Sequence, residues 1–155
     1  MPIIHEKFEN LEPKHHKGEH EDFEYKRYDF VPKGTAKGCM AHIYEVPPKK
    51  SPYPYHYHMK NEEIFYILSG SGILKTPEGE RRVNAGDMLF FPKDESGAHK
   101  LTNDSDTEIL RYLDYSTIHE VDVCIYPDSD KIGVWGENFG QVYKQRDKTG
   151  YYENE

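Results

Sequence analysis

The sequence lacks a long apolar run, an N-terminal leader pattern and any excess of positive charge. No segment approaches the roughly 20 apolar residues that a transmembrane helix needs, so we expect no membrane span. Residues 1–20 have no basic start followed by an apolar stretch, which argues against a signal peptide and makes the cytoplasm the expected location. The net charge of −8 argues against binding nucleic acid or an anionic membrane through a broad charge field.

Cysteine is also scarce, and the rest of the composition is that of a small, water-facing protein. Cys39 and Cys124 lie far apart without CxxC spacing, and we interpret them as two reduced, partly buried thiols. Hydrophobic residues make up only 35% of the chain, against 31% charged residues. A length of 155 residues fits one domain with an ordinary core.

Between the two ends of the chain, over residues 23–120, short runs of β-branched and aromatic residues alternate with turn residues. The predicted strands are 41–46, 63–68, 72–75, 81–83, 88–91, 98–103 and 107–115. No segment between residues 38 and 116 shows helical periodicity without interruption by glycine or proline. Short strands at this spacing predict an all-β sandwich or barrel.

The two ends of the chain differ from this β region. Residues 1–22 are polar and rich in His, Glu and Lys, which predicts an arm that a partner could order. We interpret the histidines in this arm as solvated rather than as a second metal site. Residues 121–155 carry turn-rich stretches and predict an irregular extension with one or two short strands. We expect this extension to pack on the barrel or on a partner subunit.

The sharpest local feature is His56-Tyr57-His58. Residues i and i+2 of a strand point to the same face, so both imidazoles can share one metal ion. Glu63 can return a carboxylate to the same point after a short turn, and His99 can add a third imidazole from a later strand. Three imidazoles and a carboxylate suit Mn, Fe, Co, Ni, Cu or Zn better than Ca or Mg. On a metal that prefers six ligands, two positions stay open for water, substrate or dioxygen.

The carboxylate could come from Glu62 or from Glu63. Alternation along the strand places Glu63 on one face with Phe65 and Ile67, and leaves the opposite face to Ile64 and its i+2 neighbours. With Glu63 facing inward, Glu62 would be solvated or hydrogen-bonded at the rim. We therefore favour Glu63 as the ligand.

Two stretches resemble the motifs of the cupin superfamily. Residues 56–70, HYHMKNEEIFYILSG, resemble the first motif, and residues 86–103, GDMLFFPKDESGAHKLTN, resemble the second. The resemblance implies a double-stranded β-helix, or jelly-roll barrel, and a metal held by His56, His58, Glu63 and His99. It places Gly70, Gly86, Pro92 and Asn103 on the structural positions of the family. It covers roughly residues 38–116. The SPYPYH approach to the histidine pair, the GAH step before His99 and the downstream YPDS stretch resemble a subgroup of small single-domain cupins.

The chain departs from the family pattern at two points. Lys50 stands where a glycine usually precedes the first histidine, and the step from Pro92 to His99 is longer than usual, with Asp94 where glycine is typical. Because this step is longer than in the family pattern, the pattern implies His99 as a ligand but does not fix its exact position.

Three further residues are candidates for the pocket. Tyr53 and Tyr55 precede the histidine pair and could donate protons at its mouth, or could pack on a dimer face. Arg111 could bind a carboxylate or phosphate of a substrate if it faced inward, although an outward surface position is favoured.

The resemblance implies two classes of function. The favoured one is a metal-dependent enzyme acting on a small polar substrate, such as a sugar, a sugar phosphate or an organic acid, by isomerase, decarboxylase, lyase or dioxygenase chemistry. The alternative is a non-catalytic barrel that binds or senses a sugar or small acid, because a fold alone does not choose a reaction. We expect one divalent metal (Mn, Fe, Ni, Co or Zn), no further cofactor, and a homodimer in which the apolar strip Ile64, Tyr66 and Leu68 is covered.

Overall fold

The computed structural model describes residues 3–32 and 34–154, and its regular structure is almost entirely β. The strands are β1 Pro13–Lys17, β2 Glu24–Asp29, β3 Cys39–Val46, β4 Tyr57–His58, β5 Glu63–Ser69, β6 Ser71–Thr76, β7 Gly79–Asn84, β8 Met88–Phe91, β9 Lys100–Asn103, β10 Leu110–Thr117, β11 Val121–Tyr126, β12 Lys131–Gly136 and β13 Gly140–Lys144. Three 3-10 turns interrupt them: η1 Phe8–Asn10, η2 Glu95–Gly97 and η3 Pro127–Ser129. All seven strands predicted from the sequence occur, with ends that differ by at most three residues.

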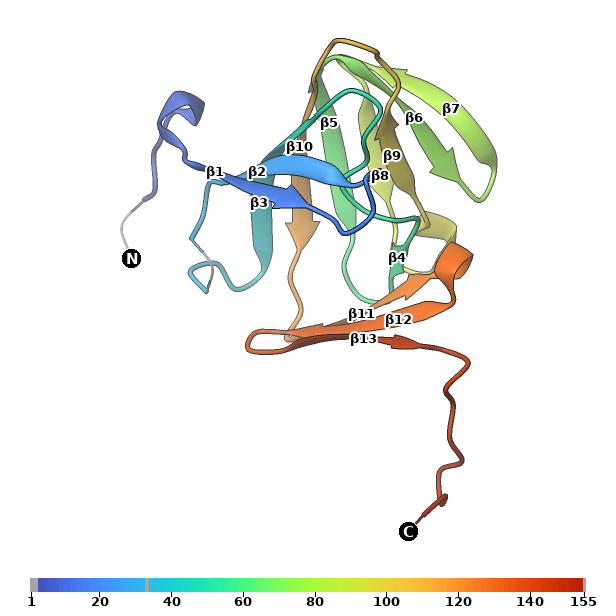
Figure 1. Cartoon of the computed structure of the whole chain (residues 1–155). Helices are drawn as coiled ribbons and strands as arrows, with labels where there is room; N and C mark the ends of the chain where they lie inside the picture. The colour runs from blue at the N-terminus through green and yellow to red at the C-terminus, as the bar shows by residue number, and fades with distance from the viewer. Residues whose placement is uncertain (1–2, 33, 155) are drawn as a thin grey trace.

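The largest sheet has six strands in the order β1-β2-β3-β10-β5-β8, all paired antiparallel (Figure 1). Side chains alternate between its two faces. In β5 the residues Phe65 and Ile67 are buried, whereas Ile64, Tyr66 and Leu68 are exposed. This is the facing that the sequence pattern predicted.

A three-stranded sheet in the order β7-β6-β9 closes the other side of the core. The buried cluster takes side chains from both sheets: Tyr25, Tyr44, Val46, Phe65, Ile67, Leu74, Val83, Phe91, Leu101, Leu110 and Tyr112. Gly70 turns the chain from β5 into β6 with φ of +80°, and a Cβ there would lie 2.7 Å from the carbonyl oxygen of Ile109. The arrangement is the all-β jelly-roll barrel that was expected.

The C-terminal extension is more regular than the sequence indicated. The prediction of irregular structure with one or two short strands is wrong, because β11, β12 and β13 form one antiparallel sheet with β4. The pairing explains the difference: β13 is exposed throughout, and β12 is mostly half-buried and carries two glycines, so their ladder of backbone hydrogen bonds leaves no clear hydrophobic alternation in the sequence. The sheet lies beside the open end of the barrel that carries β4 (Figure 1).

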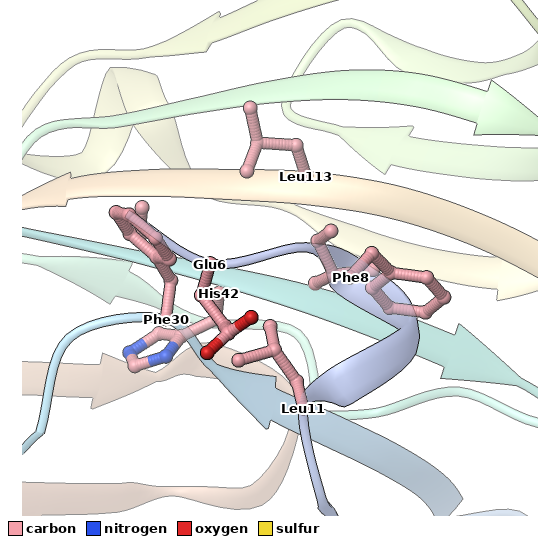
Figure 2. A pocket seen from close by; sticks show the side chains of 8 residues that line it. Glu6, Phe8, Leu11, Phe30, His42 and Leu113 are labelled. Carbon is pink, nitrogen blue, oxygen red and sulfur yellow. The ribbon is translucent and has the colours of Figure 1, made fainter. Parts of the chain in front are cut away.

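The N-terminal segment also pairs within the chain. Residues 13–17 of the predicted arm form β1 and extend the six-stranded sheet beyond β2. Ahead of β1, Phe8 and Leu11 cover outward-facing side chains of β3 and β10, and a cavity of about 150 Å³ remains between them (Figure 2). The cavity is lined by Glu6, Phe8, Leu11, Phe30, Ala41, His42, Ile43 and Leu113.

Two smaller expectations can be compared with the structure. Across residues 3–32 and 34–154, no helix has the length and apolar character needed to span a membrane. Cys39 is half-buried and Cys124 is buried, and both are free thiols, as the sequence suggested.

Candidate metal centre

Three separate parts of the chain bring the candidate ligands together. His56 and His99 form an isolated antiparallel bridge, in which each backbone N–H donates to the other residue's carbonyl oxygen, at 3.1 and 2.9 Å. His58 lies two residues further on, in β4, and Glu63 begins β5. The four residues that the sequence singled out therefore lie in one place, at the end of the barrel.

The long step before His99 is absorbed by the η2 turn. Gly97 has no room for a side chain, because a Cβ would lie 1.7 Å from the carbonyl oxygen of Pro92. Asp94 takes φ of +73°, in the left-handed region that favours glycine, and its N–H donates to the carbonyl oxygen of His58 at 2.7 Å. The turn thus ties the loop to β4 and delivers His99 to the cluster.

Glu63 lies at the middle of the cluster. Its Oε2 atom is 3.5 Å from Nε2 of His58 and 3.3 Å from Nε2 of His99. Ligand atoms of His56, His58 and Glu63 all lie within 4.8 Å of one another. Glu62, the alternative carboxylate, is exposed.

Hydrogen bonds fix which nitrogen of each ring faces the carboxylate. Nδ1 of His56 lies 2.9 Å from the carbonyl oxygen of Pro54, and Nδ1 of His99 lies 2.9 Å from that of Gly97. A carbonyl oxygen only accepts, so both Nδ1 atoms carry the proton and both Nε2 atoms present lone pairs. Burial lowers the pKa of His56 to about 4 and that of His99 well below its usual value, which keeps both rings neutral.

The cluster contains a buried carboxylate oxygen whose charge is not balanced by a hydrogen bond from the described part of the chain. Oε2 of Glu63 is buried and accepts no hydrogen bond from any residue that the structure describes. Burial opposes charge on His58, but the contacts with Asp122, Cys124 and Glu63 outweigh it and raise the pKa of His58 to about 11. A proton on His58 and a divalent metal are thus alternative ways to neutralise the same carboxylate. The donor set of imidazole nitrogens and one carboxylate fits a first-row transition metal.

The residues that support His58 were not predicted from the sequence. Asp122 Oδ2 lies 2.5 Å from Nδ1 of His58, while its Oδ1 accepts the backbone N–H groups of Lys60 at 3.0 Å and Val123 at 2.9 Å. Cys124 pairs with His58 between β11 and β4, and its Sγ lies 3.2 Å from the same Nδ1. These partners lie 64 and 66 positions away, and only the polar i and i+2 positions of β11 could have suggested them.

A buried pair on β10 was also missed. The Ser116 hydroxyl donates to Oδ1 of Asp114 at 2.8 Å and lies 3.4 Å from Oε1 of Glu63. Burial, with the nearby charge of Glu63, raises the pKa of Asp114 to about 8. The inward alternation Leu110, Tyr112, Asp114, Ser116 is the signal that could have found the pair.

Of the three other residues predicted to line the pocket, one lies beside the cluster and two do not. The Tyr53 ring lies 6.1 Å from the His56 ring, and its hydroxyl contacts that of Tyr44 at 2.9 Å. Tyr55 lies away from the cluster, under the Lys75 ammonium, which sits 4.4 Å from its ring centre. Arg111 faces outward and donates to Glu45, in the position that the sequence favoured, so it is not part of the centre.

Comparison with known proteins identifies the class. Residues 42–116, close to half of the chain, match the family model of the cupin domain, and this region is a cupin domain of the cupin superfamily. No curated protein matches the chain in sequence. A structure from Silicibacter pomeroyi, named as a sugar phosphate isomerase from a cupin superfamily, superposes with a TM-score of 0.81 at 16% identity, over 95% of both chains.

Two further structures share the fold. One from Acidithiobacillus ferrooxidans, whose name gives it as a candidate sugar phosphate isomerase, has a TM-score of 0.79 at 24% identity, over 94% of this chain and 92% of its own. A predicted oxalate decarboxylase from Thermotoga maritima has a TM-score of 0.59 at 21% identity, over 76% of this chain and 100% of its own. At these identities the likeness establishes the fold alone, and a fold does not determine a reaction.

Proposed function

We propose that this cupin is a cytoplasmic metalloenzyme acting on a small polar, oxygenated substrate, such as a sugar, a sugar phosphate or an organic acid. One divalent transition metal (Mn, Fe, Co, Ni or Zn) is held by His56, His58, Glu63 and His99. The reaction is of isomerase, decarboxylase, lyase or dioxygenase type. The names of the similar structures support this range of substrates by analogy of fold.

One observation carries the metal proposal. Oε2 of Glu63 is buried without a hydrogen-bond donor among the described residues, and the Nε2 lone pairs of two neutral histidines share its surroundings. Leaving a buried carboxylate oxygen unpartnered costs about 1–3 kcal/mol or more, and the neighbouring lone pairs add repulsion. A bound cation would remove both costs.

The residues around the cluster define what each can do. A bound metal would act as a Lewis acid toward an oxygen atom of the substrate. His56 and His99 are held by backbone carbonyls, and His58 by Asp122, so the three rings are oriented before a ligand arrives. The Asp114–Ser116 pair lies against Glu63 and can hold a proton beside it.

The first experiment is elemental analysis of the purified protein, followed by turnover assays on sugar phosphates, keto acids and diphenols. His58→Ala is expected to lose metal affinity while the barrel remains folded. Glu63→Gln should weaken metal binding at least tenfold, and the matched Glu62→Gln should leave it unchanged. A protein that takes up no transition metal even after loading would refute the proposal, whereas a metal without turnover would favour the alternative of a non-catalytic sugar- or acid-binding cupin.

We also propose a homodimer. The outer face of β5 and β8 carries Ile64, Tyr66, Met88 and Phe90, and the register places Ile64 opposite Phe90 and Tyr66 opposite Met88. Met88 and Phe90 are 72% and 60% exposed. A contiguous apolar patch of this kind at the edge of a sheet is stabilised when a second copy covers it.

A further inference from the structure

The inner face of the six-stranded sheet is apolar in one half and polar in the other. Neighbouring strands pair Asp29 with His42, His42 with Asp114, and Asp114 with Phe65. In the next row toward the end of the barrel, Ser116 pairs with Glu63. A line of polar side chains therefore runs from the proposed metal ligand across β10 and β3 to β2.

The contacts along this line are direct at both ends. Ser116 links Asp114 to Glu63, as described above, and Nδ1 of His42 lies 2.9 Å from Oδ1 of Asp29. Asp114 is 6% exposed, and the side chains of His42 and Asp29 are only 11% and 15% exposed. Burying so many polar groups is costly, so a polar half of a barrel interior points to a site that receives a polar ligand.

Two cationic side chains lie at the end of this line of polar residues that is furthest from Glu63. Among the described residues, Lys14 and Arg27 are the only lysine or arginine side chains on the inner face of this sheet. Arg27 donates to Asp29 through Nε at 2.7 Å and through a terminal nitrogen at 3.3 Å, and Lys14 Nζ donates to Asp29 at 2.5 Å. One carboxylate faces two cations, which leaves an excess of one positive charge.

Arg27 can accept a further anion without losing this ion pair. A guanidinium has five N–H donors in a fixed fork, and Asp29 takes two of them. The Arg27 side chain is 26% exposed, so solvent reaches it. Arg27 pairs with Tyr44 across β2 and β3, and the Tyr44 hydroxyl lies 2.9 Å from that of Tyr53. The Tyr53 ring centre in turn lies 6.1 Å from that of His56. The guanidinium thus borders the same interior as the metal cluster.

We propose that Arg27, assisted by Lys14, binds the anionic group of the substrate, a phosphate or a carboxylate, while the oxygenated end of the same molecule meets the metal. This inference rests on the proposed function and narrows its substrate class to acidic molecules. Three strand steps of about 4.8 Å separate Arg27 from β5 by roughly 14 Å, and the register places Arg27 in the row of Ile67, four residues or about 13 Å along the strand from Glu63. The two backbones are therefore roughly 19 Å apart, and the inward reach of both side chains shortens the gap that a ligand must span. A chain of several carbon atoms can bridge this distance, whereas a two-carbon diacid is too short.

The competing explanation is that Lys14, Arg27 and Asp29 only fasten β1 and β2 to the sheet. The two explanations differ in one respect, because a fastening role requires no affinity for free anions. Lys26 provides a matched control, since it neighbours Arg27 on β2 but is exposed on the opposite face.

The experiment is calorimetric titration of the full-length, metal-loaded protein with inorganic phosphate, ribose 5-phosphate against ribose, and gluconate against glucose. In at least one pair, we expect the charged compound to bind at least about tenfold more tightly than its neutral counterpart. The pair with the larger difference in affinity shows whether the site prefers a phosphate or a carboxylate. Arg27→Gln should abolish this preference, Arg27→Lys should retain part of it, and Lys26→Gln should leave it unchanged. Thermal melts confirm that each variant is folded.

Three outcomes would each overturn the inference. The charged and neutral compounds could bind equally, no charged compound could bind measurably, or the preference for the charged compound could survive in Arg27→Gln. Metal content is measured separately on the same samples. A protein that binds metal but shows no Arg27-dependent anion binding therefore refutes this inference alone, and one that binds no metal refutes the proposed function.

Discussion

The Asp122 carboxylate lies 2.5 Å from Nδ1 of His58, and the two residues lie on neighbouring strands, β11 and β4, of the four-stranded sheet. Asp122 belongs to β11 of the C-terminal extension, outside residues 42–116 that match the cupin domain. A carboxylate behind a ligating histidine fixes the tautomer and orientation of the ring and raises its basicity. The extension is therefore part of the centre that β4 carries.

Replacing Asp122 by Asn should weaken metal binding by about 10- to 100-fold, because His58 loses the acceptor that orients its ring. The fold should persist, since Asn keeps the shape of the side chain and can still accept the N–H groups of Lys60 and Val123. Competition with a metal-binding dye measures the affinity. Asp128→Asn, an exposed change on the same extension, serves as the control, and an affinity equal to the unmodified protein in Asp122→Asn would rule out the orienting role.

The barrel and the meeting of His56, His58 and Glu63 could be predicted because they depend on short-range patterns, whereas His99 was placed mainly by the resemblance to the cupin motifs. Alternation in residues 63–68 separates the buried Phe65 and Ile67 from the exposed strip, and this decides the facing of Glu63. The His56-Tyr57-His58 spacing needs only the two-residue period of a strand to place both rings together.

The supporting residues could not be predicted in the same way. Asp122 reaches His58 only through the pairing of β11 with β4, and Arg27 reaches the interior only because β2 extends the sheet. Such pairings across many residues leave no local pattern, because backbone hydrogen bonds form them whatever the side chains are. Arg111 shows the converse, since alternation along a single strand decides its facing, and the outward position that the sequence favoured is the one observed.

Gly97→Ala should damage the centre through the backbone. A Cβ at this position would lie 1.7 Å from the carbonyl oxygen of Pro92, so the η2 turn must shift and carry His99 with it. We expect a loss of roughly 1–3 kcal/mol in the free energy of unfolding, the typical cost when added atoms force backbone shifts in a packed region, and a weaker metal affinity. Urea unfolding and metal titration measure the two effects. Gly38→Ala, where a Cβ would meet nothing within 4 Å, should change neither, and a Gly97→Ala protein of normal stability would show that the turn tolerates a side chain.

Phe90→Asp should convert the proposed dimer into a monomer. Phe90 is 60% exposed on the edge strand β8 and lies beside Ile64, so an aspartate there would bury a charge in any interface that covers the patch. Sedimentation velocity measures the mass, and metal content should stay the same because Phe90 faces away from the cluster. Tyr152→Asp, at an 82% exposed position near the C-terminus, should leave the mass unchanged. If the unmodified protein sediments as a monomer, the patch has another role.

Asp29→Asn should destabilise the protein in a way that depends on pH. Burial of Asp29 opposes its ionisation, but the hydrogen bonds from Lys14 and Arg27 outweigh burial and hold the pKa of Asp29 below its usual value. A carboxyl group whose pKa is lowered by folding stabilises the folded state above its unfolded pKa of about 3.9, and this contribution is lost as the pH falls through the lower folded value. We therefore expect Asp29→Asn to cost about 1–3 kcal/mol at pH 7, and expect the difference from the unmodified protein to shrink steadily below pH 4. Urea unfolding at pH 7, 5, 4 and 3 measures the two curves. A difference that stays constant across this range would mean that Asp29 contributes by packing and not by its charge.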